Sequence, residues 1–121
     1  MVTKEKLQRL KEFGCDTDGA LTRVLGKEEI YLHCITEFLE EKDMDDAETA
    51  VRMGDMMETR EKIHGMKGVC GNLGFTEVYK ITCTMMDLFK SGRDREAVEM
   101  FPQLRMEYDR LTSMIRSIIS D

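Results

Sequence analysis

Proline is almost missing from this chain of 121 residues, with Pro102 its single example. No stretch alternates apolar and polar residues for long enough to indicate a β-sheet. Instead, glycine and aspartate separate segments in which apolar residues recur every three or four positions, the spacing of amphipathic helices. The sequence therefore predicts an all-α protein, and its length suits one domain spanning residues 1–121.

Long apolar runs and a surplus of basic residues are missing too. No run reaches the roughly 18 apolar residues that a membrane-spanning helix needs. The N-terminal segment MVTKEKLQRLKEFG is charged throughout, unlike a signal peptide. The net charge is -6 and 35% of the residues are charged, so little positive charge is available to displace phosphate counterions. We expect a soluble, cytoplasmic protein that binds neither membranes nor nucleic acids.

The four cysteines include no C-x-x-C pair. Cys34, Cys70 and Cys83 lie in apolar stretches, while Cys15 stands alone near the N-terminus. This distribution favours small reduced core residues over disulfide or metal use. The eleven methionines are consistent with core packing and surface scatter. No metal or cofactor site is therefore expected in this chain.

Apolar periodicity predicts the first helices of the chain. One covers about Thr3 to Phe13 and ends at Gly14, and a short helical piece after it ends at Gly26. The next should bury a single stripe of side chains: Ile30, Cys34, Ile35 and Phe38. A short polar helix is expected in DMDDAETAVRMGD.

The second half of the chain predicts longer helices. One should begin near Met56, another lies in FTEVYKITCTMMDLFK, and the last repeats apolar residues as far as Ile118. Pro102 lies within that last pattern, where it predicts a kink or a restart. Amphipathic helices joined by short turns favour an antiparallel (up-and-down) four-helix bundle with short additional N-terminal helices.

The segment KIHGMKGVCGNLG, residues 62–74, places four glycines around one histidine inside the helix that begins near Met56. Each helical glycine costs about 1 kcal/mol relative to alanine, so the segment gives up stability. Asp55 should cap the start of this helix, with Glu58 reaching back as in a capping box. Gly74 should end the helix.

A helical wheel divides this segment into two faces. One face is apolar and must lie in the core: Ile63, Met66, Val69, Cys70 and Leu73. The opposite face should be exposed to solvent: His64, Lys67, Gly68 and Gly71. An imidazole on a surface with so few side chains can be approached closely by a partner protein, and histidine forms covalent intermediates. Lys67, one turn away, could offset the negative charge of a phosphoryl group.

The segment IHGMKGVCGNLGF resembles the signature of the histidine phosphotransfer (Hpt) domain family, His-x-x-Lys-Gly followed by small residues and Leu-Gly. The matching residues are His64, Lys67, Gly68, Leu73 and Gly74. Upstream, ALTRVLGKEEIYLHCITEFLEE is similar to the helices that lead into this signature in the family. The resemblance covers the chain from about residue 14 to residue 118.

This resemblance implies a phosphocarrier of a multistep two-component phosphorelay, without kinase activity of its own. His64 would accept a phosphoryl group from a receiver-domain aspartate or a sensor kinase and pass it to another receiver aspartate. Lys67 would stabilise the phosphoryl group, while Gly68, Gly71 and Lys90 would take part in partner binding. The expected partners are response-regulator receiver domains and hybrid sensor histidine kinases. This chain is expected to be a monomer, and Mg²⁺ would be supplied by the receiver.

Two positions depart from the family's habit. Gly65 stands where a small hydroxyl residue is common, and Met86 where many members place a polar residue near the histidine. The second departure leaves open an Hpt-like module that binds a receiver or kinase without carrying phosphate.

Other interpretations are less well supported. A histidine-kinase dimerisation helix usually has an acidic residue where Gly65 stands, and a nucleotide-binding loop would need a preceding strand and a GK[ST] motif. His33 is expected beside core positions in its helix, with a structural or incidental role.

Overall fold

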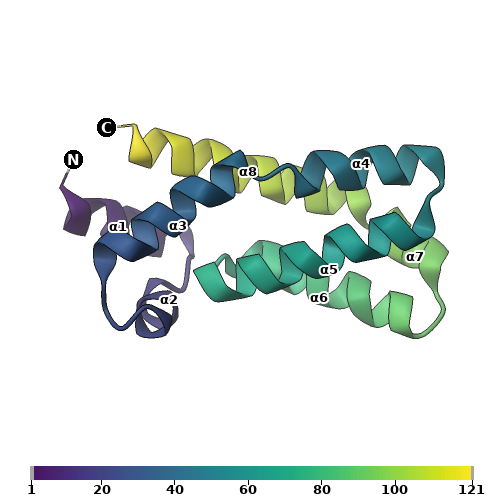
Figure 1. Ribbon diagram of the computed structural model, residues 1–121, viewed down its shortest axis with the longest axis horizontal. Helices are drawn as coiled ribbons and strands as arrows, with labels where there is room; N and C mark the ends of the chain where they lie inside the picture. Colours follow the sequence, from purple (N-terminus) through teal and green to yellow (C-terminus); the bar gives the residue numbers. More distant parts are fainter. Residues whose placement is uncertain (1, 121) are drawn as a thin grey trace.

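The computed structural model describes residues 2–120, and this part of the chain contains helices and no strand (Figure 1). Eight helices follow one another in it: α1 (Thr3–Phe13), α2 (Thr17–Arg23), α3 (Glu28–Glu40), α4 (Asp43–Met53), α5 (Met56–Leu73), α6 (Thr76–Lys90), α7 (Asp94–Glu99) and α8 (Phe101–Ile119). None of these helices is long and apolar enough to cross a membrane.

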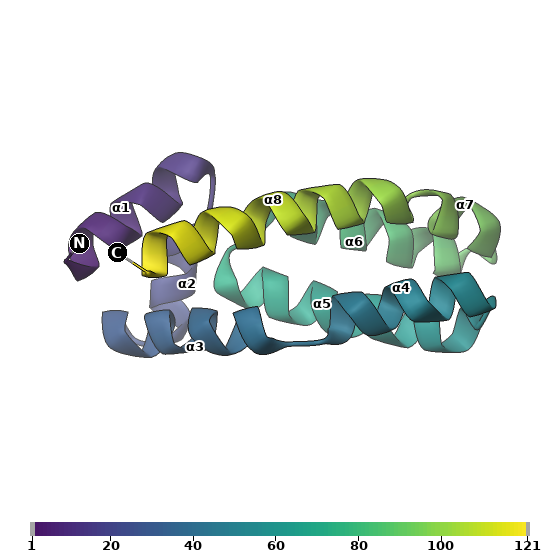
Figure 2. The ribbon, with the colours of Figure 1, turned by 90° about the horizontal axis from the view of Figure 1, so that it is seen from above.

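The longer helices form an antiparallel four-helix bundle, as predicted. α3 and α4 run nearly in line and together make one of its four rods, while α5, α6 and α8 make the others (Figure 2). α5 packs between α4 and α6. The short helices α1 and α2 lie at one end of the bundle, where they contact α8 and α5, and α7 lies at the other end (Figure 1).

The ends of the helices follow the local chemistry of the sequence. The Asp55 carboxylate accepts a hydrogen bond of 3.1 Å from the backbone N–H of Glu58, which caps the start of α5 as predicted. Gly54 and Gly74 end α4 and α5 with φ values of 70° and 77°, a region that glycine adopts without steric cost. Pro102 stands in the first turn of α8, so the predicted restart is confirmed.

A single cluster of buried apolar side chains includes residues from all eight described helices. Within this cluster the Phe38 ring of α3 has its centroid 4.8 Å from that of Phe75 and 5.6 Å from that of Tyr108. These tilted aromatic contacts join three rods of the bundle. The core therefore extends through the whole bundle and includes the N-terminal helices.

The predicted buried stripe of α3 was wrong at Ile30, and Cys34 is half-buried at its edge. Ile30 is 44% exposed, whereas its neighbour Tyr31 is fully buried in the core with Ile35 and Phe38. Tyr31 takes the buried position because its hydroxyl donates a hydrogen bond of 2.7 Å to the carbonyl oxygen of Leu73 at the end of α5. A tyrosine can be buried at low cost when its hydroxyl has such a partner.

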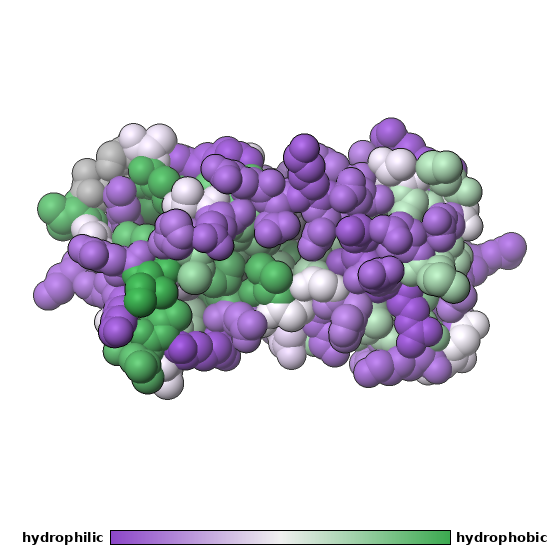
Figure 3. Space-filling model, in the orientation of Figure 1, coloured by the Kyte–Doolittle hydropathy of each residue, from purple (hydrophilic) through white to green (hydrophobic). Residues whose placement is uncertain are grey.

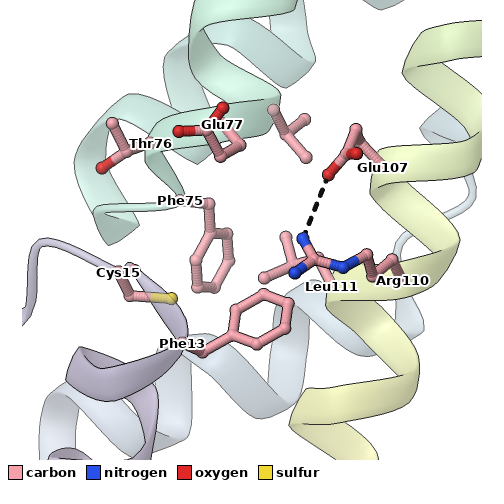
Figure 4. A pocket seen from close by; sticks show the side chains of 10 residues that line it. Phe13, Cys15, Phe75, Thr76, Glu77, Glu107, Arg110 and Leu111 are labelled. Carbon is pink, nitrogen blue, oxygen red and sulfur yellow. Dashed lines mark hydrogen bonds and ion pairs between the residues drawn. The ribbon is translucent and has the colours of Figure 1, made fainter.

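The N-terminal helix α1 is held against α8 by a stacked arginine (Figure 4). The Arg110 guanidinium lies 4.6 Å from the centre of the Phe13 ring and forms an ion pair of 3.4 Å with Glu107. Beneath this pair, Cys15 and Phe75 line a cavity of about 20 Å³. A cavity of this size holds about one water molecule, so it is a packing gap between α1, α6 and α8.

Three consecutive carbonyl groups at the end of α5 accept hydrogen bonds from the N-terminal part of the chain. Arg23 Nη1 donates to Asn72 O at 3.0 Å, and the Tyr31 hydroxyl donates to Leu73 O. The backbone N–H of Asp16 donates to Gly74 O at 2.8 Å. The last carbonyls of a helix have no partner within the helix. Groups of α2 and α3, and Asp16 just before α2, supply the missing donors for α5.

The contact at Gly74 predicts a large effect of Gly74→Ala. An added Cβ would lie 2.3 Å from the carbonyl oxygen of Asp16, and φ is unfavourable for alanine. We expect a loss of more than about 2 kcal/mol in the free energy of unfolding, measured by urea denaturation. The matched control is Gly54→Ala, which has a similar φ but nothing within 4 Å. Equal losses in the two variants would contradict the close approach.

The different burial of the four cysteines leads to a second prediction. Burial raises the pKa of Cys15 to about 11 and that of Cys70 to about 12, whereas Cys34 and Cys83 are half-buried. Because the thiolate is the reactive form, iodoacetamide at mildly alkaline pH should label Cys34 and Cys83 long before Cys15 and Cys70 in the native protein. Mass spectrometry would locate the label, and all four sites should react in concentrated urea. Early labelling of Cys70 would show that its burial is incomplete.

Candidate functional site

His64 lies in the middle of α5, and its side chain is exposed. The rotation of the helix is fixed by side chains on its other face, all of them buried: Ile63, Met66, Cys70 and Leu73. Val69, predicted in the core, is half-buried at the edge of that face. The division of the helix into two faces is therefore confirmed, with His64 and Gly68 exposed, whereas Lys67 and Gly71 are half-buried.

Two grooves meet at His64. The first, here called the Tyr79 groove, is lined by residues of α2, α5 and α6: Arg23, His64, Lys67, Gly68, Gly71, Asn72 and Tyr79. The second, the Met86 groove, is lined by residues of α5 and α6: Met57, Arg60, Glu61, His64, Met86 and Lys90. The imidazole therefore stands on a ridge between two grooves, where a convex partner surface can reach it from either side.

The predicted site residues are divided between these grooves. Lys67, Gly68 and Gly71 line the Tyr79 groove with His64, whereas Lys90 lies in the Met86 groove. His64 belongs to both. The structure thus places the other four residues around His64, with the two lysines in grooves on opposite sides of it.

The charges around His64 are mostly positive. Lys67 and Arg23 line the Tyr79 groove, which has no acidic residue among those that line it. Arg60 and Lys90 line the Met86 groove, with Glu61 the one carboxylate. Within residues 2–120, no ion pair engages Lys67, Arg60 or Lys90. Positive charge concentrated in this way attracts anionic groups, although the chain as a whole carries a net charge of -6.

The glycines of the site differ in what surrounds them. A Cβ at Gly68 would meet nothing within 4 Å, so the helix surface beside His64 is open to solvent. At Gly71 a Cβ would lie 2.8 Å from Cε1 of Tyr79, which means that the Tyr79 ring packs directly on the helix backbone. Gly65 faces Asp43 at an ordinary contact distance of 3.6 Å. The open space that a docking partner needs is therefore at Gly68, whereas Gly71 admits the aromatic ring.

Tyr79 was not among the residues that the sequence predicted for this site. It forms a wall of the groove, with 37% of its surface exposed. A hydrogen bond between its side chain and that of Cys83 raises the pKa of Tyr79, and the nearby positive charge of Arg23 acts in the opposite direction. Arg23 was missed as well, since it belongs to another helix and meets α5 only through folding.

None of the groups in residues 2–120 holds the imidazole of His64. Met86, where the sequence lacks a polar residue, is buried beside the histidine in the Met86 groove. In the described part of the chain, His64 takes part in no hydrogen bond and no ion pair. Both ring nitrogens are therefore accessible to solvent or to a partner.

His33, the other histidine, is not beside the core as predicted. Its side chain is 71% exposed, and Nε2 lies 2.7 Å from a carboxylate oxygen of Glu37 one turn along α3. Among residues 2–120, no group of three or more His, Cys, Asp or Glu residues is placed to hold a metal ion. His64 is thus the candidate centre of chemistry in this structure.

Comparison with known families gives one match, to the model of the Hpt domain over residues 35–114. This segment covers roughly two thirds of the chain and includes His64 and both grooves apart from Arg23. The chain belongs to the Hpt domain family. No curated protein and no solved structure matches it in the same comparisons.

Membership of the Hpt family makes this chain a module related to histidine phosphotransfer in phosphorelays, with receiver domains and histidine kinases as the partners of such modules. The matched segment begins within α3. α1 and α2 precede it, so Asp16 and Arg23, which bind the end of the His64 helix, lie outside the matched segment.

Because their surroundings differ, we expect alanine substitutions at Gly68 and Gly71 to change the stability of the protein differently. Gly68→Ala should raise the free energy of unfolding by about 0.5–1 kcal/mol, because alanine favours the helix and meets no neighbour. Gly71→Ala should gain less or lose stability, because the Tyr79 ring must move. Thermal and urea denaturation would compare the two variants. A destabilised Gly68→Ala variant would mean that this surface is packed.

Proposed function

We propose that this Hpt domain is a histidine phosphocarrier of a multistep phosphorelay. His64 accepts a phosphoryl group from the aspartyl phosphate of a receiver domain, or from a sensor kinase, and passes it to another receiver aspartate. The observation that supports this role best is the exposed imidazole without protein partners, on a ridge between two grooves lined by cations. No nucleotide or metal is required from this chain for such a transfer.

The chemistry requires a neutral imidazole nitrogen with an accessible lone pair. We assign the attack to Nε2 of His64. A bond forms between Nε2 and phosphorus while the bond from phosphorus to the aspartyl oxygen breaks, and the aspartate leaves as a carboxylate. The proton on the other ring nitrogen can be released to solvent from the exposed ring. Transfer to the next receiver aspartate reverses these steps. The bond between Nε2 and phosphorus breaks while a bond forms between an aspartyl oxygen and phosphorus.

Positioning and charge stabilisation carry most of the catalysis in phosphoryl transfer. Lys67 lies one turn from His64 on the same helix face and in the same groove, where its ammonium group can approach the phosphoryl oxygens. Lys90, across the ridge, is placed to bind the partner. The partner supplies the acidic aspartate and Mg²⁺, and the bare helix at Gly68 leaves room for its loops.

A second function, a binding module that carries no phosphate, is supported by one observation. Met86 is buried beside His64 and offers no strong hydrogen bond to orient the imidazole. A module of this kind would use the same grooves to bind a receiver or a kinase without forming phosphohistidine. The two functions differ in whether His64 becomes covalently modified.

The decisive experiment is transfer from a receiver domain carrying ³²P on its aspartate, tested with wild type and His64→Gln. We expect acid-labile, alkali-stable label on wild type and only background label on the variant. Because His64 is exposed, the substitution should change the free energy of unfolding by no more than about 0.5 kcal/mol. Tight receiver binding without label on wild type would favour the binding module. Equal label on wild type and variant would exclude His64 as the acceptor.

A further inference from the structure

Arg23 brings a positive charge to the His64 site from outside the segment that matches the Hpt model. It is the last residue of α2, and it lines the Tyr79 groove with His64 and Lys67. Its Nη1 donates to the carbonyl oxygen of Asn72, which fixes the guanidinium at the end of α5. This contact joins residues 49 positions apart in the chain, so the fold as a whole places Arg23 in the groove.

The distance from His64 suits contact with a docked protein. Asn72 follows His64 by about two helical turns, which is roughly 12 Å along the axis of α5. The guanidinium therefore lies too far along the helix to reach a phosphoryl group on His64. A protein interface of ordinary size covers about 800 Å² on each partner, a patch of roughly 16 Å radius. A partner centred on His64 therefore covers Arg23.

The charge and the chemistry of Arg23 favour an acidic contact. A guanidinium has five N–H donors, and the contact with Asn72 uses one of them. None of the residues that line the Tyr79 groove is acidic. A carboxylate on a partner can therefore pair with Arg23 without competition from this wall of the groove.

The chain that follows Arg23 exposes apolar side chains, which are common at the centre of interfaces. Leu25, two residues further along, is 84% exposed, and Ile30 of α3 is 44% exposed. Hydrophobic side chains gather at the end of the molecule where α2 and α3 lie (Figure 3). An exposed leucine two residues from a fixed arginine is a suitable combination for binding a protein surface.

We propose that Arg23 is a docking residue that pairs with a carboxylate of the receiver domain while His64 exchanges the phosphoryl group. The proposal rests on the phosphocarrier function and makes α2 part of the partner-binding surface. Charge pairs at the edge of an interface act mainly on association and on its salt dependence. Arg23 therefore contributes to the choice of partner, and the chemistry at His64 proceeds without it.

The alternative is that Arg23 serves only to cap the last carbonyls of α5. Such a cap stabilises the helix end and the neighbouring helices. A capping role predicts lower stability of variants that lose the guanidinium, whatever partner is used. The docking role predicts a defect that depends on the partner and on salt.

The test uses a purified receiver domain that transfers its phosphoryl group to the wild-type chain, after that receiver has been phosphorylated with acetyl phosphate and Mg²⁺. The variants are Arg23→Gln, Arg23→Lys and the control Arg95→Gln. Arg95 is an exposed arginine of α7, at the far end of the bundle (Figure 1). Phosphorylation of His64 by phosphoramidate, a small donor that needs no docking, reports on the intrinsic reactivity of each variant.

For Arg23→Gln we expect a roughly fivefold rise in KM for the phosphorylated receiver at low salt, little change in kcat, and a loss of the effect at high salt. Arg23→Lys should recover most of the affinity, and Arg95→Gln should behave as wild type. Phosphoramidate should label all of them equally.

The proposal is overturned if Arg23→Gln transfers like Arg95→Gln, or if its defect appears equally with phosphoramidate and follows a lowered melting temperature. Absence of label on wild type from every donor would instead refute the phosphocarrier function. The two failures are therefore distinguishable.

Discussion

The arrangement of the site depends on the hydrogen bonds that the last carbonyl groups of α5 accept from the N-terminal part of the chain. A helix of 18 residues ends here with carbonyl groups that need partners, and consecutive ones are bound by Arg23, the Tyr31 hydroxyl and the Asp16 backbone. Gly74 makes this possible because the chain can approach it within a distance that no side chain would allow. The N-terminal helices are thereby joined to the helix that carries His64, and one wall of the Tyr79 groove comes from them.

These hydrogen bonds also explain how the exposed His64 can have a defined position although its imidazole has no hydrogen bond or ion pair within the described residues. The rotation of α5 is set by buried side chains on its other face, and its end is fixed by the three hydrogen bonds. The imidazole therefore has a fixed backbone position but free ring nitrogens. For the proposed phospho-acceptor, a free Nε2 is suitable, because a protein contact at that nitrogen would have to break in each exchange.

Local patterns in the sequence were enough to predict the helices, the bundle and the exposed face with His64, Lys67 and Gly68. Those features depend on apolar spacing, caps and glycine, which act over a few residues. Ile30 was predicted in the core in place of Tyr31, because the burial of Tyr31 depends on a carbonyl of a distant helix. Arg23 and Tyr79 were missed for the same reason. Gly71 resembled Gly68 on the wheel, and only the packing of Tyr79 against its backbone separates the two.

The charges on the two sides of α5 differ in a way that bears on partner choice. Towards α4, Lys62 has three carboxylates within 4 Å, from Asp43, Asp46 and Glu58, so its positive charge is more than balanced. Towards the grooves, Lys67 and Lys90 have no ion-pair partner within the described residues. Exposed ion pairs add little stability, so pairing these two lysines would have gained the fold little. Left unpaired, they give an acidic protein a positive surface around His64, which would attract an acidic receiver site.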